Sequence, residues 1–244
     1  MSEKGIGPSE IWHFVNDLRN ELKIPVKYII QIKFEDSPKE SGHVLVKDDK
    51  VLGSELSFDK KVKVPTDVLL HSLSHVKHYS MGFPHIVAKI PIKGHDWFLY
   101  HTLNEYNTNL IEMQHFKKQF ISFLKNHKAL TSRIVESEKR FKKYFSERTE
   151  QVKVEALSDF LRMKVICDDL GIGSAPYDDC IRILRKDCYR ILGFDSAKEG
   201  KRLFEEKFPP LPKERYTKES IETVLNFFNV RKRKGLNVYI WKET

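Results

Sequence analysis

The first periodic segment of the chain predicts an amphipathic helix. Its apolar side chains recur every three or four residues: Ile11, Phe14, Val15, Leu18 and Leu22. This is the spacing at which side chains line one face of a helix. Pro8 is suited to the first helical turn, and Pro25 is expected to end the helix.

The pattern then changes to one that predicts strands and a second helix. Residues 26–34 are rich in β-branched side chains, which favours a strand. Residues 43–46 and 51–58 flank a polar turn and predict a hairpin. A helix is expected from about residue 65 to residue 80, before Gly82 and Pro84.

Beyond residue 96 the pattern becomes mostly helical. It predicts one long helix over residues 97–127, further helices over 132–145, 150–170, 177–192 and 218–230, and a short strand over 236–241. The sequence therefore predicts an α+β fold followed by a helical C-terminal region, with domains at residues 1–127 and 128–244.

Composition and charge limit the classes of function. With 40% hydrophobic and 11% aromatic residues, the 244-residue chain is too apolar to be a disordered tail. No apolar run suits a signal peptide or a membrane span. The spacing of the three cysteines suits neither a disulfide framework nor a metal knuckle. A cytoplasmic protein that does not enter membranes is therefore expected.

The net charge of +9 suggests an anionic partner, and it is unevenly distributed. Residues 1–127 hold 17 basic and 15 acidic side chains, whereas residues 128–244 hold 26 and 19. A nucleic-acid-binding or regulatory role for the second region is therefore the alternative hypothesis. The cluster Arg231–Lys234 beside Tyr239 and Trp241 is compatible with phosphate contact, although a solvated turn is the favoured interpretation.

Histidines carry the candidate chemistry. His71 and His75 are four residues apart on a predicted helix, so both project from one face and could hold one metal ion. Glu105, in a run with few other charges, offers a third ligand from the next predicted helix. Asn109, one turn later, could hold a ligand in place. The pattern also fits two exposed histidines and an ordinary surface carboxylate.

These residues resemble a metallopeptidase family. The segment His71-Ser-Leu-Ser-His75, followed by Glu105 and Asn109, is similar to the zinc site of gluzincin-type metallopeptidases, which have H-E-x-x-H on one helix and Glu on a following helix. The order of predicted elements, namely one helix, a small antiparallel or mixed sheet, the metal-binding helix and the glutamate helix, resembles the minimal gluzincin scaffold of ImmA/IrrE-like proteins, which is a zincin-like fold. The resemblance covers residues 9–115. It implies zinc as cofactor, a peptide or protein as substrate, and residues 51–58 as a strand that pairs with an extended peptide.

Ser72 departs from the family pattern. The family has Glu at this position as the general base, and a serine cannot take that role at neutral pH. The sequence therefore predicts a zinc-binding protein whose peptidase activity is impaired. Three explanations are open: a natural pseudoenzyme, an engineered change, or a different base such as His78 or His101.

Overall fold

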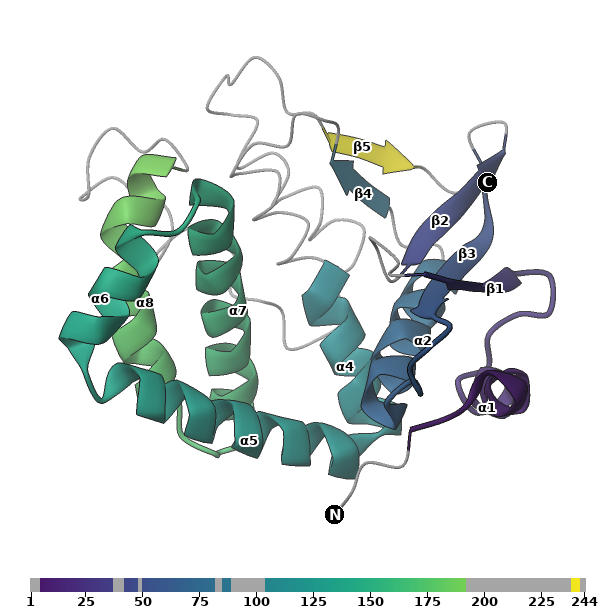
Figure 1. The fold of residues 1–244 in the computed structure, drawn as a ribbon, viewed down its shortest axis with the longest axis horizontal. Helices are drawn as coiled ribbons and strands as arrows, with labels where there is room; N and C mark the ends of the chain where they lie inside the picture. Colours follow the sequence, from purple (N-terminus) through teal and green to yellow (C-terminus); the bar gives the residue numbers. More distant parts are fainter. Residues whose placement is uncertain are drawn as a thin grey trace. The chain divides into compact units, whose positions relative to one another are not determined.

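The protein is described by a computed structural model that covers residues 5–36, 42–47, 50–81, 85–88, 104–191 and 238–241. These residues form an α+β fold, as the sequence predicts (Figure 1). The elements occur in this order: α1 (Pro8–Glu21), β1 (Ile29–Glu35), β2 (Gly42–Lys47), β3 (Lys50–Asp59), α2 (Thr66–Ser80), β4 (His85–Ala88), α4 (Tyr106–His115), α5 (Lys117–Val135), α6 (Glu138–Ser146), α7 (Glu150–Asp169), α8 (Ala175–Ile191) and β5 (Val238–Trp241).

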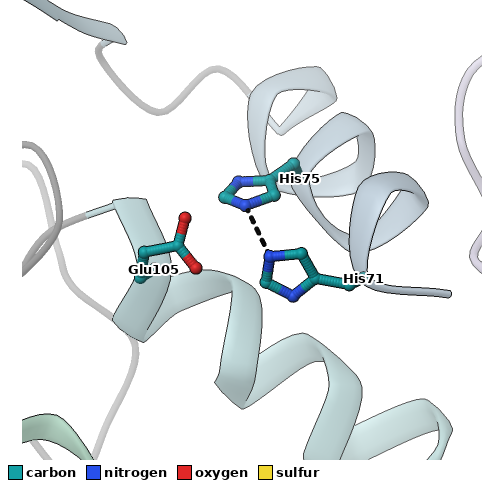
Figure 2. A group of neighbouring side chains, drawn as sticks. All are labelled: His71, His75 and Glu105. Carbon is teal, nitrogen blue, oxygen red and sulfur yellow. Dashed lines mark hydrogen bonds between the residues drawn. The ribbon is translucent and has the colours of Figure 1, made fainter. Parts of the chain in front are cut away.

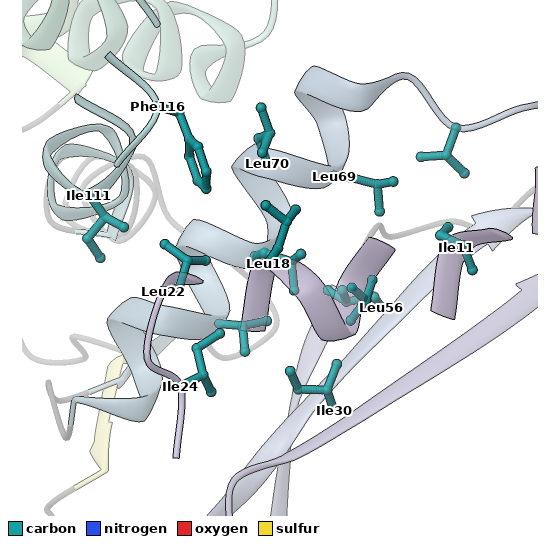
Figure 3. Close-up of a cluster of buried hydrophobic side chains, with 14 of the residues drawn as sticks. Ile11, Leu18, Leu22, Ile24, Ile30, Leu56, Leu69, Leu70, Ile111 and Phe116 are labelled. Atoms are coloured by element: carbon teal, nitrogen blue, oxygen red, sulfur yellow. The ribbon is translucent and has the colours of Figure 1, made fainter. Parts of the chain in front are cut away.

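Helices α1 and α2 pack against a small sheet through one apolar core (Figure 3). α1 supplies Ile11, Val15 and Leu18, as its spacing predicts. α2 supplies Leu69, Leu70, Leu73 and Val76, the sheet supplies Ile30, Leu56 and Phe58, and Ile111 and Phe116 complete the cluster. This core fixes the orientation of α2, the helix that carries His71 and His75.

The sheet has the order β1-β3-β2 and is mixed. β2 and β3 form the predicted antiparallel hairpin, whereas β1 and β3 pair in parallel, so of the two expected arrangements, antiparallel or mixed, the sheet has the mixed one. Gly53 permits the parallel pair to approach closely, because a Cβ atom at this position would lie 2.0 Å from the carbonyl oxygen of Ile29. Glycine is the residue that this contact accommodates.

The central place of β3 corrects one expectation about the substrate cleft. β1 occupies one backbone edge of β3 and β2 occupies the other. β1 pairs with residues 53–59 and β2 with residues 50–56, so residues 53–56 are paired on both sides. Over this central part of β3 an extended peptide cannot pair as the family resemblance implies for residues 51–58, since peptide addition requires an open edge.

β1 begins later than predicted because the chain between α1 and β1 forms a bonded turn. Lys23 has a positive φ of 51° just after the helix. The Nη2 atom of Arg19 then donates to the carbonyl oxygens of Pro25, Val26 and Tyr28 at 2.6, 2.7 and 2.9 Å. Residues 26–28 are held by these bonds and do not join the sheet.

Over residues 128–191, the described helical part of the second region, the helical prediction is confirmed, with different boundaries. α7 and α8 lie close to the predicted ranges. The long helix over 97–127 is wrong for its described part, because α4 ends before Phe116 and α5 continues through residue 127 to Val135. α6 starts at Glu138, later than the predicted residue 132. β5 confirms a strand near the C-terminus and pairs with β4, which the pattern did not predict. The predicted helix over 218–230 lies outside the described residues.

Two compact units divide the chain. One comprises residues 1–85, 107–120 and 240–244, and the other residues 86–106 and 121–239. The boundary predicted after residue 127 falls within α5. Within the described ranges, no helix combines the length and the apolar composition needed to cross a membrane.

Candidate metal centre

His71, His75 and Glu105 form a group that could hold a metal ion (Figure 2). One ligand atom from each residue lies within 4.8 Å of the others, and all three side chains are half-buried. The Nε2 atoms of the two histidines are 3.1 Å apart, and their rings meet edge to face. A tetrahedral ion with bonds of about 2.1 Å separates its ligand atoms by about 3.4 Å, so the spacing requires only a small adjustment.

The opposite nitrogen of each histidine is also bonded. The Nδ1 atom of His71 lies 3.0 Å from the Oε1 atom of Glu112, and Nδ1 of His75 lies 2.8 Å from the Oγ1 atom of Thr108. A metal-binding histidine normally donates its other ring N–H to such an acceptor, which fixes the ring and its tautomer. Both rings are therefore held with Nε2 toward a common point.

Glu112 is the residue that links α4 to His71. It is only 8% exposed, and its Oε2 atom accepts a hydrogen bond of 2.7 Å from the Nδ2 atom of Asn109. Because a carboxylate accepts, Nδ1 of His71 donates to it, so Nε2 is unprotonated and its lone pair, which faces His75, can bind a cation instead. Asn109 thus supports the site through Glu112, and no direct bond to His71, His75 or Glu105 is observed among the described contacts.

Thr108 allows the His75 ring to exchange its tautomer. Without an ion, His75 can donate from Nε2 to His71, and its Nδ1 can then accept from the threonine hydroxyl. With Nε2 bound to a cation, Nδ1 carries the proton and the hydroxyl accepts it, since a hydroxyl can take either role. The stacked ring of Tyr79, 5.9 Å from that of His75 between centroids, packs against the same imidazole.

The charges of the group favour a divalent cation. Glu105 and Glu112 together bring two negative charges to two imidazoles that are neutral when they bind metal. A buried or half-buried carboxylate is costly unless a charge or hydrogen bonds compensate it. A divalent cation between the imidazoles and Glu105 would balance both carboxylates.

A helical turn positions Glu105. Residues 104–105 form a π-helical turn that continues directly into α4, so the unit boundary after residue 106 falls inside one helical segment. Tyr106 anchors the start of α4 because it is fully buried, and this burial raises its pKa to about 12. π-Helical turns are frequent at functional sites because they redirect one side chain.

The remaining candidate residues have different positions. Ser72 is 8% exposed and follows His71 on the buried side of α2. His78 is 1% exposed, and its ring centroid lies 5.3 Å from that of Tyr79. The metal-binding group found among the described residues does not include His78. His101 lies outside the described residues.

Glu112 and Thr108 are the site residues that sequence reasoning missed. Glu105, Thr108, Asn109 and Glu112 follow one another at offsets of three, four and seven. This spacing places all four on one face of a helix. The same periodicity that identified the histidine pair could therefore have identified both residues.

Comparisons with protein-family models, with curated proteins and with solved structures gave no match for this chain. The functional interpretation therefore depends on the geometry and chemistry of the site.

Proposed function

We propose that this chain is a zinc-binding protein with a scaffold similar to that of gluzincin-type metallopeptidases, and that it does not hydrolyse peptides efficiently. The observation that carries the proposal is the facing pair of Nε2 atoms, 3.1 Å apart, with Glu105 beside them and both Nδ1 atoms bonded behind them. Two imidazoles and one carboxylate are a common protein donor set for zinc, with a fourth position left open.

Two observations support a loss of peptidase function. Ser72 occupies the position of the general base, so no carboxylate at that position can accept a proton from an attacking water. Residues 53–56 of β3 are paired on both sides within their own sheet, so the centre of this strand offers no backbone edge to a peptide. Binding of zinc depends on neither feature, because the donors lie on α2 and at the start of α4.

The first test is a zinc titration of the full chain. We expect one zinc ion per chain, and at least a tenfold weaker affinity after His75→Ala or Glu105→Ala, because each change removes a donor. Matched controls are His13→Ala and Glu21→Ala, which alter exposed residues of α1 and should leave the affinity unchanged. Wild-type protein that takes up no zinc would refute the proposal, as would equal losses in the control variants.

The second test restores the missing base. Ser72→Glu should raise peptidase activity on an unfolded protein substrate by about 10²–10⁴-fold if the absent carboxylate alone limits hydrolysis. Ser72 is buried, so circular dichroism must show that the variant folds and a zinc titration must show that it still binds the ion. A folded, zinc-loaded variant without activity would show that the missing carboxylate is not the sole defect and that the substrate cleft is altered as well.

A further inference from the structure

The positive charge of the chain is concentrated on two consecutive helices. Residues 117–148, which contain α5 and α6, hold 10 basic and 3 acidic side chains. Residues 150–191, which contain α7 and α8, hold 7 basic and 8 acidic side chains. The segment with α5 and α6 thus accounts for +7 of the net +9, whereas the next two helices are close to neutral.

The outward side of α6 carries cations that no described carboxylate neutralises. Phe141 and Phe145 are buried and fix the inward side of the helix. Lys139, Arg140 and Lys143 are exposed on the opposite side, and none of them forms an ion pair within the described part of the chain. Lys142 differs, because its Nζ atom lies 2.6 Å from the Oε1 atom of Glu138.

The like charges of Lys139, Arg140 and Lys143 lie close enough to repel one another weakly, and a bound anion would reduce this repulsion. Lys139 and Arg140 lie four and three residues before Lys143, which are the spacings at which helical side chains become neighbours. Like charges at these spacings destabilise a helix. Glu147 is also exposed one turn after Lys143, yet the two do not form an ion pair in the structure. A ligand with regularly spaced negative charges would relieve the repulsion.

An aromatic side chain flanks the cations. Tyr144 is 48% exposed, and the guanidinium of Arg148 lies over its ring at 4.1 Å from the centroid. Exposed aromatic rings and arginine planes provide stacking surfaces where the bases of a nucleic acid are unpaired, and lysine and arginine charges bind the phosphates of duplexes and single strands alike. Because the phenylalanines of α6 point inward, its outward side has no large apolar side chain to insert into a lipid surface.

We propose that the α6 face (Lys139, Arg140, Lys143, Tyr144 and Arg148) binds the phosphate backbone of nucleic acid. The proposal does not depend on zinc binding, since no residue of the α6 face belongs to the metal centre. It also locates the interaction on α6, without the predicted cluster Arg231–Lys234, which lies outside the described residues.

The test measures the fluorescence anisotropy of a labelled DNA duplex of about 20 base pairs, titrated with the full chain between about 50 and 200 mM salt. Lys139→Gln/Lys143→Gln should weaken binding at least tenfold near 0.1 M salt. Each lost phosphate contact should also reduce the slope of log affinity against log salt by about 0.9. The matched control is Lys27→Gln/Lys63→Gln, which removes the same charge from exposed lysines outside the helical region and should retain wild-type affinity.

Several outcomes would overturn the proposal. One is that the wild-type chain does not bind the duplex even at the lower salt concentration. Another is that the two double variants lose affinity equally, because an equal loss would indicate a general effect of net charge. A parallel titration with phosphatidylcholine–phosphatidylserine vesicles gives the last alternative. Binding to vesicles without binding to the duplex would assign the α6 face to an anionic membrane surface.

Discussion

His71 and His75 belong to the region with the sheet, α1, α2 and α4, whereas His127 belongs to the helical region of α5–α8. In the first region, two imidazoles face each other across 3.1 Å, with a carboxylate beside them. In the second, the Nδ1 atom of His127 lies 3.0 Å from the hydroxyl of Tyr177, and the two rings stack at 5.8 Å between centroids. One arrangement leaves ligand atoms directed at a shared point, and the other closes a hydrogen bond within a packed core.

The difference shows that the partners of a histidine decide its role, even where local helical patterns are alike. Burial is the largest effect on His127 and lowers its pKa, with nearby Asp159 opposing this shift and Arg162 adding to it. Burial also raises the pKa of Tyr177, so both partners stay neutral near pH 7. A neutral, internally bonded pair stabilises packing, whereas the group at α2 has donors available for a cation.

The largest expected effect concerns the scaffold of the first region. Gly53→Ala should lower the free energy of unfolding by more than about 3 kcal/mol, because the new Cβ atom would lie 2.0 Å from the carbonyl oxygen of Ile29. Zinc affinity should fall with it, since the sheet supports α2. Urea unfolding followed by circular dichroism measures the change. Gly7→Ala is the control, because its nearest neighbour would be 3.8 Å away and the cost should stay below about 1 kcal/mol.

Glu112→Gln tests whether the residue behind His71 matters to the ion. Zinc affinity should fall by about 10–100-fold, because the carboxylate that orients the ring and balances the cation is lost. The exposed Glu136 provides the control variant Glu136→Gln, and a competition titration with a chelating dye measures both. Equal affinity in the wild type and Glu112→Gln would show that His71 is positioned by packing alone.

Tyr177→Phe makes the matching change in the helical region. Removal of the hydroxyl leaves Nδ1 of His127 without its bond to Tyr177 and should lower the free energy of unfolding by about 1 kcal/mol. Zinc affinity should not change. Thermal unfolding and a zinc titration on the same sample separate the two effects, and a loss of zinc affinity would contradict the assignment of a purely structural role.

The smallest expected effect is a pH dependence. The pKa of His127 is lowered in the folded state, so the unfolded chain binds this proton more readily. Its contribution to stability is therefore complete above the unfolded value of 6.5 and is lost as the pH falls through the folded pKa. Unfolding between pH 7.5 and pH 5 should show a smaller decline in His127→Gln than in the wild type, by less than about 1 kcal/mol. Identical slopes would show that other groups carry the pH dependence.

Local periodicity was sufficient to predict the elements that depend on neighbours in sequence. A helical period of three to four residues predicts the apolar face of α1 and the shared face of His71 and His75 on α2. A period of two residues predicts the strands of the hairpin formed by β2 and β3. Such patterns report which side of an element is buried. They also placed Glu105 on the next helix, because few other charges surround it in the sequence.

The features that local patterns did not predict depend on distant contacts. β1 pairs in parallel with β3, although β2 lies between them in the sequence. β4 pairs with β5, which follows about 150 residues later in the chain. The break at Phe116 carries no proline or glycine signal. Its N–H still bonds to the carbonyl oxygen of Glu112 at 2.6 Å, and Phe116 is buried in the core, so the break coincides with a tertiary contact and not with a local sequence signal.

The donors of the candidate metal centre come from α2 and from the helical turn that leads into α4, with His75 and Glu105 thirty positions apart in the chain. In the language of chain entropy, an ion held by both helices would be a removable cross-link that closes a long loop. In simple polymer estimates, a cross-link between residues at this separation lowers the conformational entropy of the unfolded chain and so stabilises the folded state by about 3–4 kcal/mol. A single coordination sphere would thus couple folding to metal supply, and withdrawal of the ion by a chelator would lower the melting temperature without any covalent change.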